Sequence, residues 1–110
     1  MSSLSYAITT HNEGDSIKKL IELLYKNKKE CDEVIVLDDF SSDPTTITYL
    51  NKVPNLYKKK LMKNFASHKN YLNSLCNCDY IFQLDGDELP TINLLKFIRN
   101  VINYRNDIDL

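Results

Sequence analysis

Segments typical of strands and segments typical of amphipathic helices alternate along almost the whole chain. The strand-like segments are LSYAIT, EVIVLD, the weaker and lysine-rich NLYKKKLM, and DYIFQLD, at residues 4–9, 33–38, 55–62 and 79–85. The unbroken apolar run of residues 33–38 indicates burial on both faces, as in a parallel sheet. The lysines of residues 55–62 are typical of an edge strand. This alternation constrains the fold more than any other feature of the sequence.

A helical pattern follows each strand-like segment. Residues 15–27 repeat apolar side chains at helical spacing, and Asp15 or Ser16 can cap the start of that helix. Residues 41–52 predict a short helix with Asp43 as its N-cap and Pro44 at its first position. Residues 64–76 and 90–106 predict two more helices. Their apolar stripes are Phe65, Leu72, Leu75 and Cys76 in the first, and Leu94 or Leu95, Ile98, and Val101 or Ile102 in the second.

This order predicts an α/β, Rossmann-like domain of about four mainly parallel strands flanked by helices. The 110 residues are enough for one domain, which we expect to span residues 1–110. A formal net charge of −1 does not favour nucleic acid or an anionic membrane as a partner. No segment predicts a membrane span or a signal peptide, and the three cysteines are an odd number. We therefore expect a cytoplasmic protein with free, buried or merely tolerated thiols.

Polar side chains gather where three of the predicted strands end. Residues 9–13 (Thr9, Thr10, His11, Asn12 and Glu13) follow the first strand, Asp38 and Asp39 end the second, and Asp85 and Asp87 end the fourth. Ligands of open α/β sheets bind beyond the carboxyl ends of the strands, where the strand order reverses. The chain's two glycines exclude a dinucleotide fingerprint or a P-loop. We therefore expect these polar groups to line one cleft.

A purely structural interpretation competes with this one. Asp38, Asp39 and Asp43 are residue types that turns and helix caps favour, and the acidic run at residues 85–88 is compatible with a solvated loop. Glu88 by itself favours a structural or supporting role. His11 is compatible with an ordinary loop position, and His68 with the surface or core of a helix.

Other carboxylate sites fit the run DGDELP less well. An EF-hand loop needs glycine where Pro90 stands. A haloacid-dehalogenase-type phosphatase has threonine or valine where Leu89 stands, and a second acidic motif later in the chain. A response-regulator receiver would use Asp85 as phosphoacceptor, but its acidic pair follows the first strand. A phosphoacceptor or phosphatase-like domain is thus the less favoured alternative.

Four segments together resemble a known family. SYAITTHNEGDSIKKLIELL, EVIVLDDFSSDPT, NFASHKNYLNSL and DYIFQLDGDELP resemble, in this order, the nucleotide-binding half of a GT-A family 2 glycosyltransferase. The branch they resemble most includes lipopolysaccharide-core glucosyltransferases, whose fourth strand ends in an Asp-x-Asp-Glu run. The chain is short for that family. The resemblance implies transfer of a hexosyl group from a UDP-sugar, with UDP-glucose as the expected donor.

The resemblance also implies a role for each motif. Residues 9–13 would lie along the nucleotide, and Asp39, with Asp38 beside it, would accept the uracil N–H. Lys69, followed by Asn70, would lie near the nucleotide or its diphosphate. Asp85 would reach the ribose or the water shell of a metal ion, in the motif Asp85-Gly86-Asp87. Asp87 would bind Mn²⁺ or Mg²⁺ directly.

The chemistry of that assignment is consistent. A hard divalent cation prefers carboxylate and phosphate oxygens, and Mg²⁺ commonly takes only one or two protein ligands. Such an ion offsets the charge on departing UDP, which makes Asp87 a predicted catalytic residue. Glu88 is the other predicted catalytic residue, as a candidate base. The group that takes the acceptor proton stays open between Glu88, Glu13 and His11.

Three outcomes stay open at this level: a minimal active transferase, a slow UDP-sugar hydrolase, or a remnant that only binds the nucleotide sugar. A short domain of this kind would leave apolar sheet surface uncovered. We therefore expect a homodimer or a larger homo-oligomer.

Overall fold

The computed structural model describes residues 2–62 and 64–108, in which strands and helices alternate as predicted. The strands are β1 (Leu4–Thr10), β2 (Glu33–Asp38), β3 (Leu56–Lys58) and β4 (Tyr80–Asp85). The helices are α1 (Asp15–Asn27), α2 (Pro44–Leu50), α3 (Phe65–Ser74) and α4 (Ile92–Ile108). Strand β3 is shorter than the segment predicted for it, because residues 59–62 leave the sheet.

The four strands form one parallel sheet in the order β3-β2-β1-β4. In the centre of the sheet, Tyr6 of β1 is in register with Val34 of β2 and with Phe82 of β4. The chain builds outward from β1 to β3 and then crosses back to place β4 on the other side of β1. This confirms the predicted α/β class, and it places the reversal of strand order between β1 and β4.

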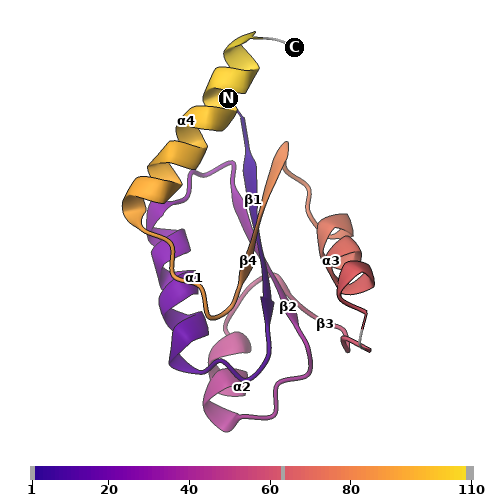
Figure 1. Ribbon diagram of the computed structural model, residues 1–110. Helices are drawn as coiled ribbons and strands as arrows, with labels where there is room; N and C mark the ends of the chain where they lie inside the picture. The colour runs from indigo at the N-terminus through magenta and orange to yellow at the C-terminus, as the bar shows by residue number, and fades with distance from the viewer. Residues whose placement is uncertain (1, 63, 109–110) are drawn as a thin grey trace.

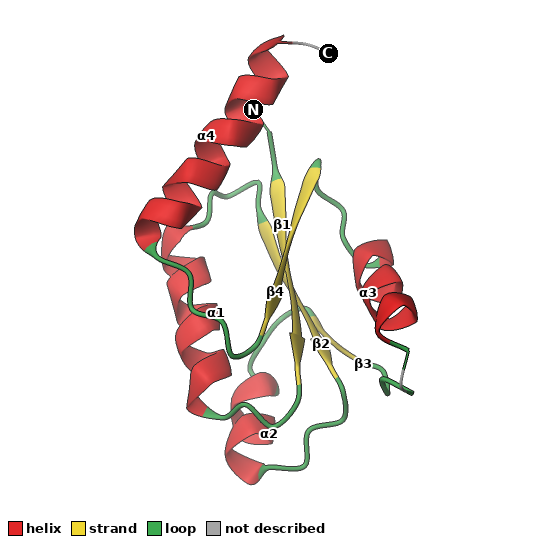
Figure 2. Ribbon diagram, in the orientation of Figure 1, coloured by secondary structure: helices red, strands yellow, loops and turns green. Residues whose placement is uncertain are grey.

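Helices cover the two faces of the sheet unequally (Figure 1). Helices α1, α2 and α4 lie on one face, and α3 lies on the other (Figure 2). The larger core joins α1 residues such as Leu20 and Leu24 to Tyr6 and Ile8 of β1. The smaller core joins Leu72 of α3 to strand residues that point the other way, namely Ala7, Ile35 and Leu37. Both faces of β1 and β2 are thus buried, as the apolar run of β2 predicts.

Two of the helices are capped by side chains. Asp43 accepts a hydrogen bond from Thr46 N at 3.0 Å, with Pro44 in the first turn, which confirms the prediction for α2. Asn64 caps α3 in the same way through Ser67 N at 3.0 Å. The predicted cap of α1 by Asp15 or Ser16 was wrong. The N-cap is Gly14, which has a φ of +52° and makes no side-chain capping bond.

The buried stripes of α3 and α4 refine the predictions. In α4, Leu95 and Ile102 are buried, whereas the alternatives Leu94 and Val101 are exposed. In α3, Leu72 is buried, but Phe65 is 67% exposed, so its predicted place in the stripe was wrong. Phe65 is the first residue of the helix and lies beyond the carboxyl ends of the strands, where no sheet covers it.

The cysteines are free, as expected, but none is fully buried. Cys31 is exposed, and Cys76 and Cys78 are half-buried. Burial raises the pKa of the Cys76 thiol, which keeps it in the unreactive protonated form. Within residues 2–62 and 64–108, no helix combines the length and the apolar character that crossing a membrane requires.

Candidate functional site

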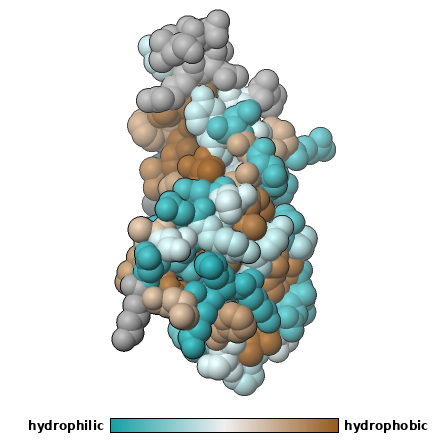
Figure 3. Space-filling view, turned by 90° about the vertical axis from the view of Figure 1, so that its right-hand side faces the viewer, coloured by the Kyte–Doolittle hydropathy of each residue, from teal (hydrophilic) through white to brown (hydrophobic). Residues whose placement is uncertain are grey.

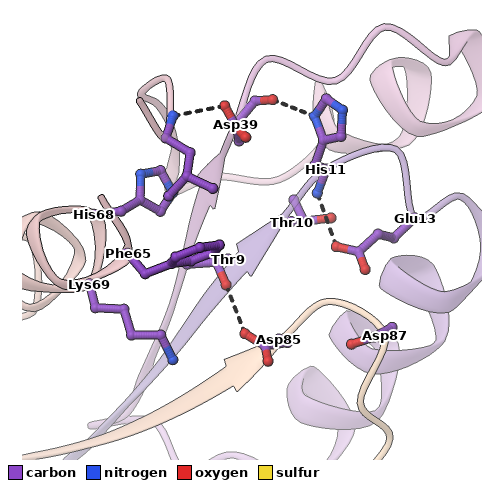
Figure 4. Close-up of a pocket in the computed structure, with 11 residues that line it drawn as sticks. Thr9, Thr10, His11, Glu13, Asp39, Phe65, His68, Lys69, Asp85 and Asp87 are labelled. Carbon is purple, nitrogen blue, oxygen red and sulfur yellow. Dashed lines mark hydrogen bonds between the residues drawn. The ribbon is translucent and has the colours of Figure 1, made fainter. Parts of the chain in front are cut away.

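A pocket of about 300 Å³ opens at the carboxyl ends of β1, β2 and β4, beside the reversal of strand order. Figure 4 shows its lining, which comes from the last residues of β1 and β4, from the loops after the four strands and from the start of α3. The lining residues are Thr9, Thr10, His11, Glu13, Asp39, Leu61, Phe65, His68, Lys69, Asp85 and Asp87. The fold therefore brings eight of the predicted site residues to one place.

The loop after β1 connects the other parts of the site. Thr9 Oγ1 donates a hydrogen bond to Asp85 Oδ1 at 3.1 Å. The His11 ring contacts the backbone carbonyl oxygen of Asp39 at 2.5 Å through Nδ1. Since a carbonyl oxygen only accepts, Nδ1 carries the proton, and Nε2 can accept from the Asn12 side-chain amide, 3.3 Å away. Both ring nitrogens of His11 thus have a partner, and the partner of Nδ1 lies just after β2.

The neighbouring aspartates at the end of β2 have different surroundings. Asp38 is 2% exposed, and its carboxylate accepts from the Ser41 hydroxyl at 2.6 Å and from Ser41 N. Asp39 lines the pocket, and its Oδ1 accepts from Leu61 N at 3.0 Å. The turn interpretation therefore describes Asp38, while Asp39 lines the pocket and its binding role stays a prediction.

The turn after β4 presents two carboxylates to the pocket and holds a third outside its lining. Asp85 and Asp87 are exposed and line the pocket. Gly86 is buried between them, and its N–H donates to the Thr9 carbonyl oxygen at 2.8 Å. Glu88 lies outside the pocket lining, and its Oε1 accepts from Asp85 N at 2.7 Å. Glu88 thus stabilises the turn, and its proposed catalytic role stays a prediction.

Asn12 also lies outside the pocket lining. Its φ is +53°, and its side-chain oxygen accepts from the backbone N–H groups of Ser42 and Asp43 at 2.7 and 2.9 Å. Asn12 therefore ties the loop after β1 to the loop after β2. These hydrogen bonds position the two loops relative to each other at the pocket.

The start of α3 forms the remaining wall. Lys69 lines the pocket, and its place near the nucleotide or its diphosphate stays a prediction. Sequence reasoning gave no binding role to Leu61, Phe65 or His68, which also line it. His68 precedes the buried Leu72 by four residues and so shares its helix face, a signal that could have placed it against the sheet. No comparable signal marks Leu61.

The carboxylate oxygens of the pocket suit a metal ion that also binds phosphate oxygens. In the part of the chain that the structure describes, no three His, Cys, Asp or Glu side chains are grouped to hold a metal ion. Asp85 and Asp87 supply exposed carboxylate oxygens in the same pocket. Mg²⁺ in nucleotide sites is commonly bound by one or two carboxylates plus phosphate oxygens and waters. The two aspartates fit such an ion.

Comparison with known proteins agrees with this geometry. Residues 5–109 match the family described as glycosyl transferase family 2. The chain belongs to this family. It is also similar to a protein of Rickettsia bellii named uncharacterized glycosyltransferase, at 31% identity over 104 residues and 92% of this chain. A protein of the same name from Rickettsia felis is 32% identical over 107 residues, or 94% of this chain.

These matches confirm the family resemblance predicted from the four segments. The family 2 chain spans about a third of the length of these curated relatives, 32% and 34% respectively. The matched region contains every strand of the described sheet except the first residue of β1, and the whole pocket lining.

Proposed function

We propose that this family 2 chain binds a UDP-sugar together with Mn²⁺ or Mg²⁺ and transfers the sugar, UDP-glucose being the expected donor. The observation that carries the proposal is the shared pocket, which joins Asp39 after β2 to Asp85 and Asp87 at the end of β4. A UDP-sugar requires a hydrogen-bond acceptor for the N–H of its base. At its diphosphate it requires carboxylates that hold a metal ion. Family membership supports glycosyl transfer as the reaction.

Asp39 is suited to bind the base. Its Oδ1 accepts from Leu61 N, which fixes the carboxylate, and Oδ2 receives no hydrogen bond from any described residue. That second oxygen can accept the N–H of uracil. A cytosine ring presents an acceptor nitrogen at the equivalent position, which a carboxylate would repel.

Asp85 and Asp87 are suited to bind the diphosphate through the metal. Two carboxylates alone would repel a diphosphate, so charge balance requires a cation between them. When bound, the divalent ion would offset the negative charge that develops on UDP as it leaves. Thr9 holds Asp85 in place through its hydroxyl, and Lys69 adds a positive charge on the opposite wall.

In the transfer, the bond from the anomeric carbon of the sugar to the β-phosphate oxygen breaks, and a bond to an acceptor oxygen forms. UDP leaves with the bonding electrons, and the acceptor proton must pass to a base. Of the three candidates, Glu88 lies outside the pocket lining and His11 has both ring nitrogens engaged. Glu13 lines the pocket and accepts from His11 N at 3.0 Å. We therefore propose Glu13 as the base.

The test is UDP release and UDP binding with a panel of UDP-sugars, with Mn²⁺ or Mg²⁺ and with a chelator. We expect metal-dependent binding and turnover, with UDP-glucose preferred, and loss of both in Asp87→Ala. Glu30→Ala is the matched control, because Glu30 is an exposed carboxylate before β2. It lies at the amino ends of the strands, whereas the pocket lies at their carboxyl ends. Metal-dependent binding that is unchanged in Asp87→Ala would contradict the assignment.

The same assay separates the alternatives. Binding without UDP release identifies a nucleotide-sugar-binding remnant, and UDP release with free sugar as the product identifies a hydrolase. A phosphoacceptor would instead bind beryllofluoride at Asp85 and ignore UDP-sugars.

A further inference from the structure

His68 is a polar residue at a buried position of the core. Its side chain lies on the face of α3 that packs on the sheet, one helical turn before Leu72, and it is only 5% exposed. Within the described part of the chain, Nδ1 of His68 is buried and has no hydrogen-bond partner. A buried ring nitrogen without a partner is uncommon in folded proteins and calls for a physical reason.

Packing alone does not provide that reason. An unpaired buried polar group destabilises the folded protein, whereas a leucine at the same helix position would extend the apolar stripe of Leu72. A polar ring at such a site fits a residue that gains its partner when a ligand binds. His68 lines the pocket and 5% of the residue stays exposed, so a ligand there can contact its side chain.

The surroundings of His68 indicate which part of a ligand it would meet. The ring lies on the α3 wall between Asp39 and Phe65, away from Asp87 (Figure 4). Leu61 and Phe65 make this end of the pocket apolar, and Phe65 presents a side chain that is 67% exposed. An exposed aromatic ring beside one carboxylate acceptor and one imidazole suits a planar base better than a phosphate or a sugar.

We propose that His68 is a specificity-determining residue that donates a ring N–H to a carbonyl oxygen of the nucleobase, which packs against Phe65. This inference rests on the proposed function, because it assumes that a UDP-sugar occupies the pocket. Uracil carries its N–H between two carbonyl groups, so Asp39 accepts the N–H while His68 donates to a neighbouring carbonyl. Either ring nitrogen of an imidazole can carry the proton, and no described residue bonds to Nδ1 to fix which one does.

A comparison with cytosine shows how Asp39 and His68 would discriminate between bases. Its ring nitrogen at the equivalent position is an acceptor, and an amino group replaces one of the two carbonyl groups. At Asp39 the contact becomes acceptor against acceptor. At His68, a ring N–H that bonds to the uracil carbonyl oxygen finds no acceptor in the amino group that replaces it. The pair thus selects UDP over CDP by direct contact.

The experiment measures the dissociation constants of UDP and CDP by calorimetry in the presence of Mn²⁺, for the full chain and for His68→Leu. We expect the variant to bind UDP about tenfold more weakly, as for the loss of one hydrogen bond, with CDP affinity nearly unchanged. We also expect the variant to unfold at the same or a higher urea concentration. A merely structural histidine would not give this combination.

Two further variants sharpen the test. His68→Gln keeps an N–H donor and should retain most of the affinity for UDP, and it serves if His68→Leu fails to fold. Ser67→Ala, at the exposed neighbouring position on α3, should not change the affinity for UDP. Phe65→Ala should weaken UDP about tenfold through lost stacking, whereas Tyr71→Ala, an exposed aromatic outside the pocket lining, should not.

The outcomes separate this inference from the proposed function. If the full chain binds UDP with Mn²⁺ but His68→Leu binds it equally well, His68 is a packing residue and the inference is wrong while the proposed function stands. Equal affinity of the full chain for UDP and CDP would likewise contradict the proposed contact with the base. If the full chain binds no UDP at all, the proposed function is wrong and this inference is wrong with it.

Discussion

Gly86 lies between the two pocket carboxylates, and its α-carbon packs closely on the loop after β1. A Cβ atom at this position would meet Glu13 Oε1 at 2.7 Å, Thr10 Oγ1 at 2.8 Å and Thr10 Cβ at 3.0 Å. The end of the Glu13 side chain can move, but Thr10 is 3% exposed and fixed in the sheet. The small size of Gly86 therefore holds Asp85 and Asp87 against β1.

We predict that Gly86→Ala displaces this turn. The overlap with Thr10 should lower the free energy of unfolding by about 1–3 kcal/mol, and the displaced carboxylates should bind Mn²⁺ and UDP more weakly. Chemical denaturation and calorimetry measure the two effects.

Gly14→Ala is the comparison, because Gly14 has φ +52° but a Cβ added there would have no atom within 4 Å. Its strained backbone should cost about 1–2 kcal/mol while the affinity is retained. Unchanged affinity in Gly86→Ala would show that the close contact with Thr10 does not position the carboxylates.

At this scale the sequence predicted residue types better than residue roles. Asp38 and Asp39 look equivalent in the sequence, yet Asp38 ends β2 and is buried against Ser41, whereas Asp39 lies just beyond the strand and lines the pocket. His68 and Phe65 were not assigned to the site because only the position of α3 on the sheet decides which of its residues face the pocket. That position depends on contacts distant in sequence.

At the scale of elements, α4 is tied to the sheet by a buried ion pair. The Asp32 side chain is fully buried, accepts from Leu4 N at 2.9 Å and Lys29 N at 2.8 Å, and pairs with Arg99 of α4. Arg99 also donates to the Ser2 carbonyl oxygen at 3.1 Å. Helix periodicity predicted the apolar stripe of α4 but gave no sign of this pair, whose partners are 67 residues apart.

We predict that Arg99→Met destabilises the protein by about 3 kcal/mol, because it leaves the Asp32 carboxylate buried without its cation. Lys96→Met, at an exposed lysine one turn earlier in α4, should change the free energy of unfolding by less than about 0.5 kcal/mol. Urea denaturation measures both values. Equal effects of the two substitutions would mean that the charge of Arg99 does not stabilise the fold.

Glu33 gives a pH-dependent link between β2 and the loop before β4. Its carboxylate accepts from the Ser5 hydroxyl at 2.5 Å and from Asn77 N at 2.6 Å. Burial alone would raise the pKa of Glu33, but these bonds and one from Cys78 outweigh it and hold the pKa below its ordinary value of 4.5. The ionised form is therefore favoured in the folded protein.

We predict that this contribution is fully present above pH 4.5 and is lost as the pH falls through the lower folded-state pKa, because the unfolded chain binds the proton first. Glu33→Gln should be less stable at neutral pH, and its stability should fall less steeply on acidification. Unfolding curves recorded from neutral pH to below 4.5 test this. Parallel pH profiles of the two proteins would contradict the prediction.

At the scale of the whole molecule, the layers are unequal and hydrophobic side chains stay exposed. Only α3 covers one face of the sheet, where hydrophobic residues appear in several groups among hydrophilic ones (Figure 3). Strand β4 lies at an edge, with Ile81 42% exposed. Helix α4 exposes Phe97 at 62% and Tyr104 at 65%. Alternating patterns predicted the sheet, but which side chains stay uncovered depends on strand order and helix placement.

We predict that the 110-residue chain self-associates through the exposed hydrophobic side chains of α4, because burying them in a second copy removes apolar surface from water. Sedimentation velocity over a range of concentrations should show a dimer or larger species, and Phe97→Glu should shift it to monomer. Asn103→Glu, an exposed position on the same helix, is the control and should not. A monomer at every concentration would exclude self-association, and a dimer insensitive to Phe97→Glu would move the interface away from α4, toward the open edge of β4.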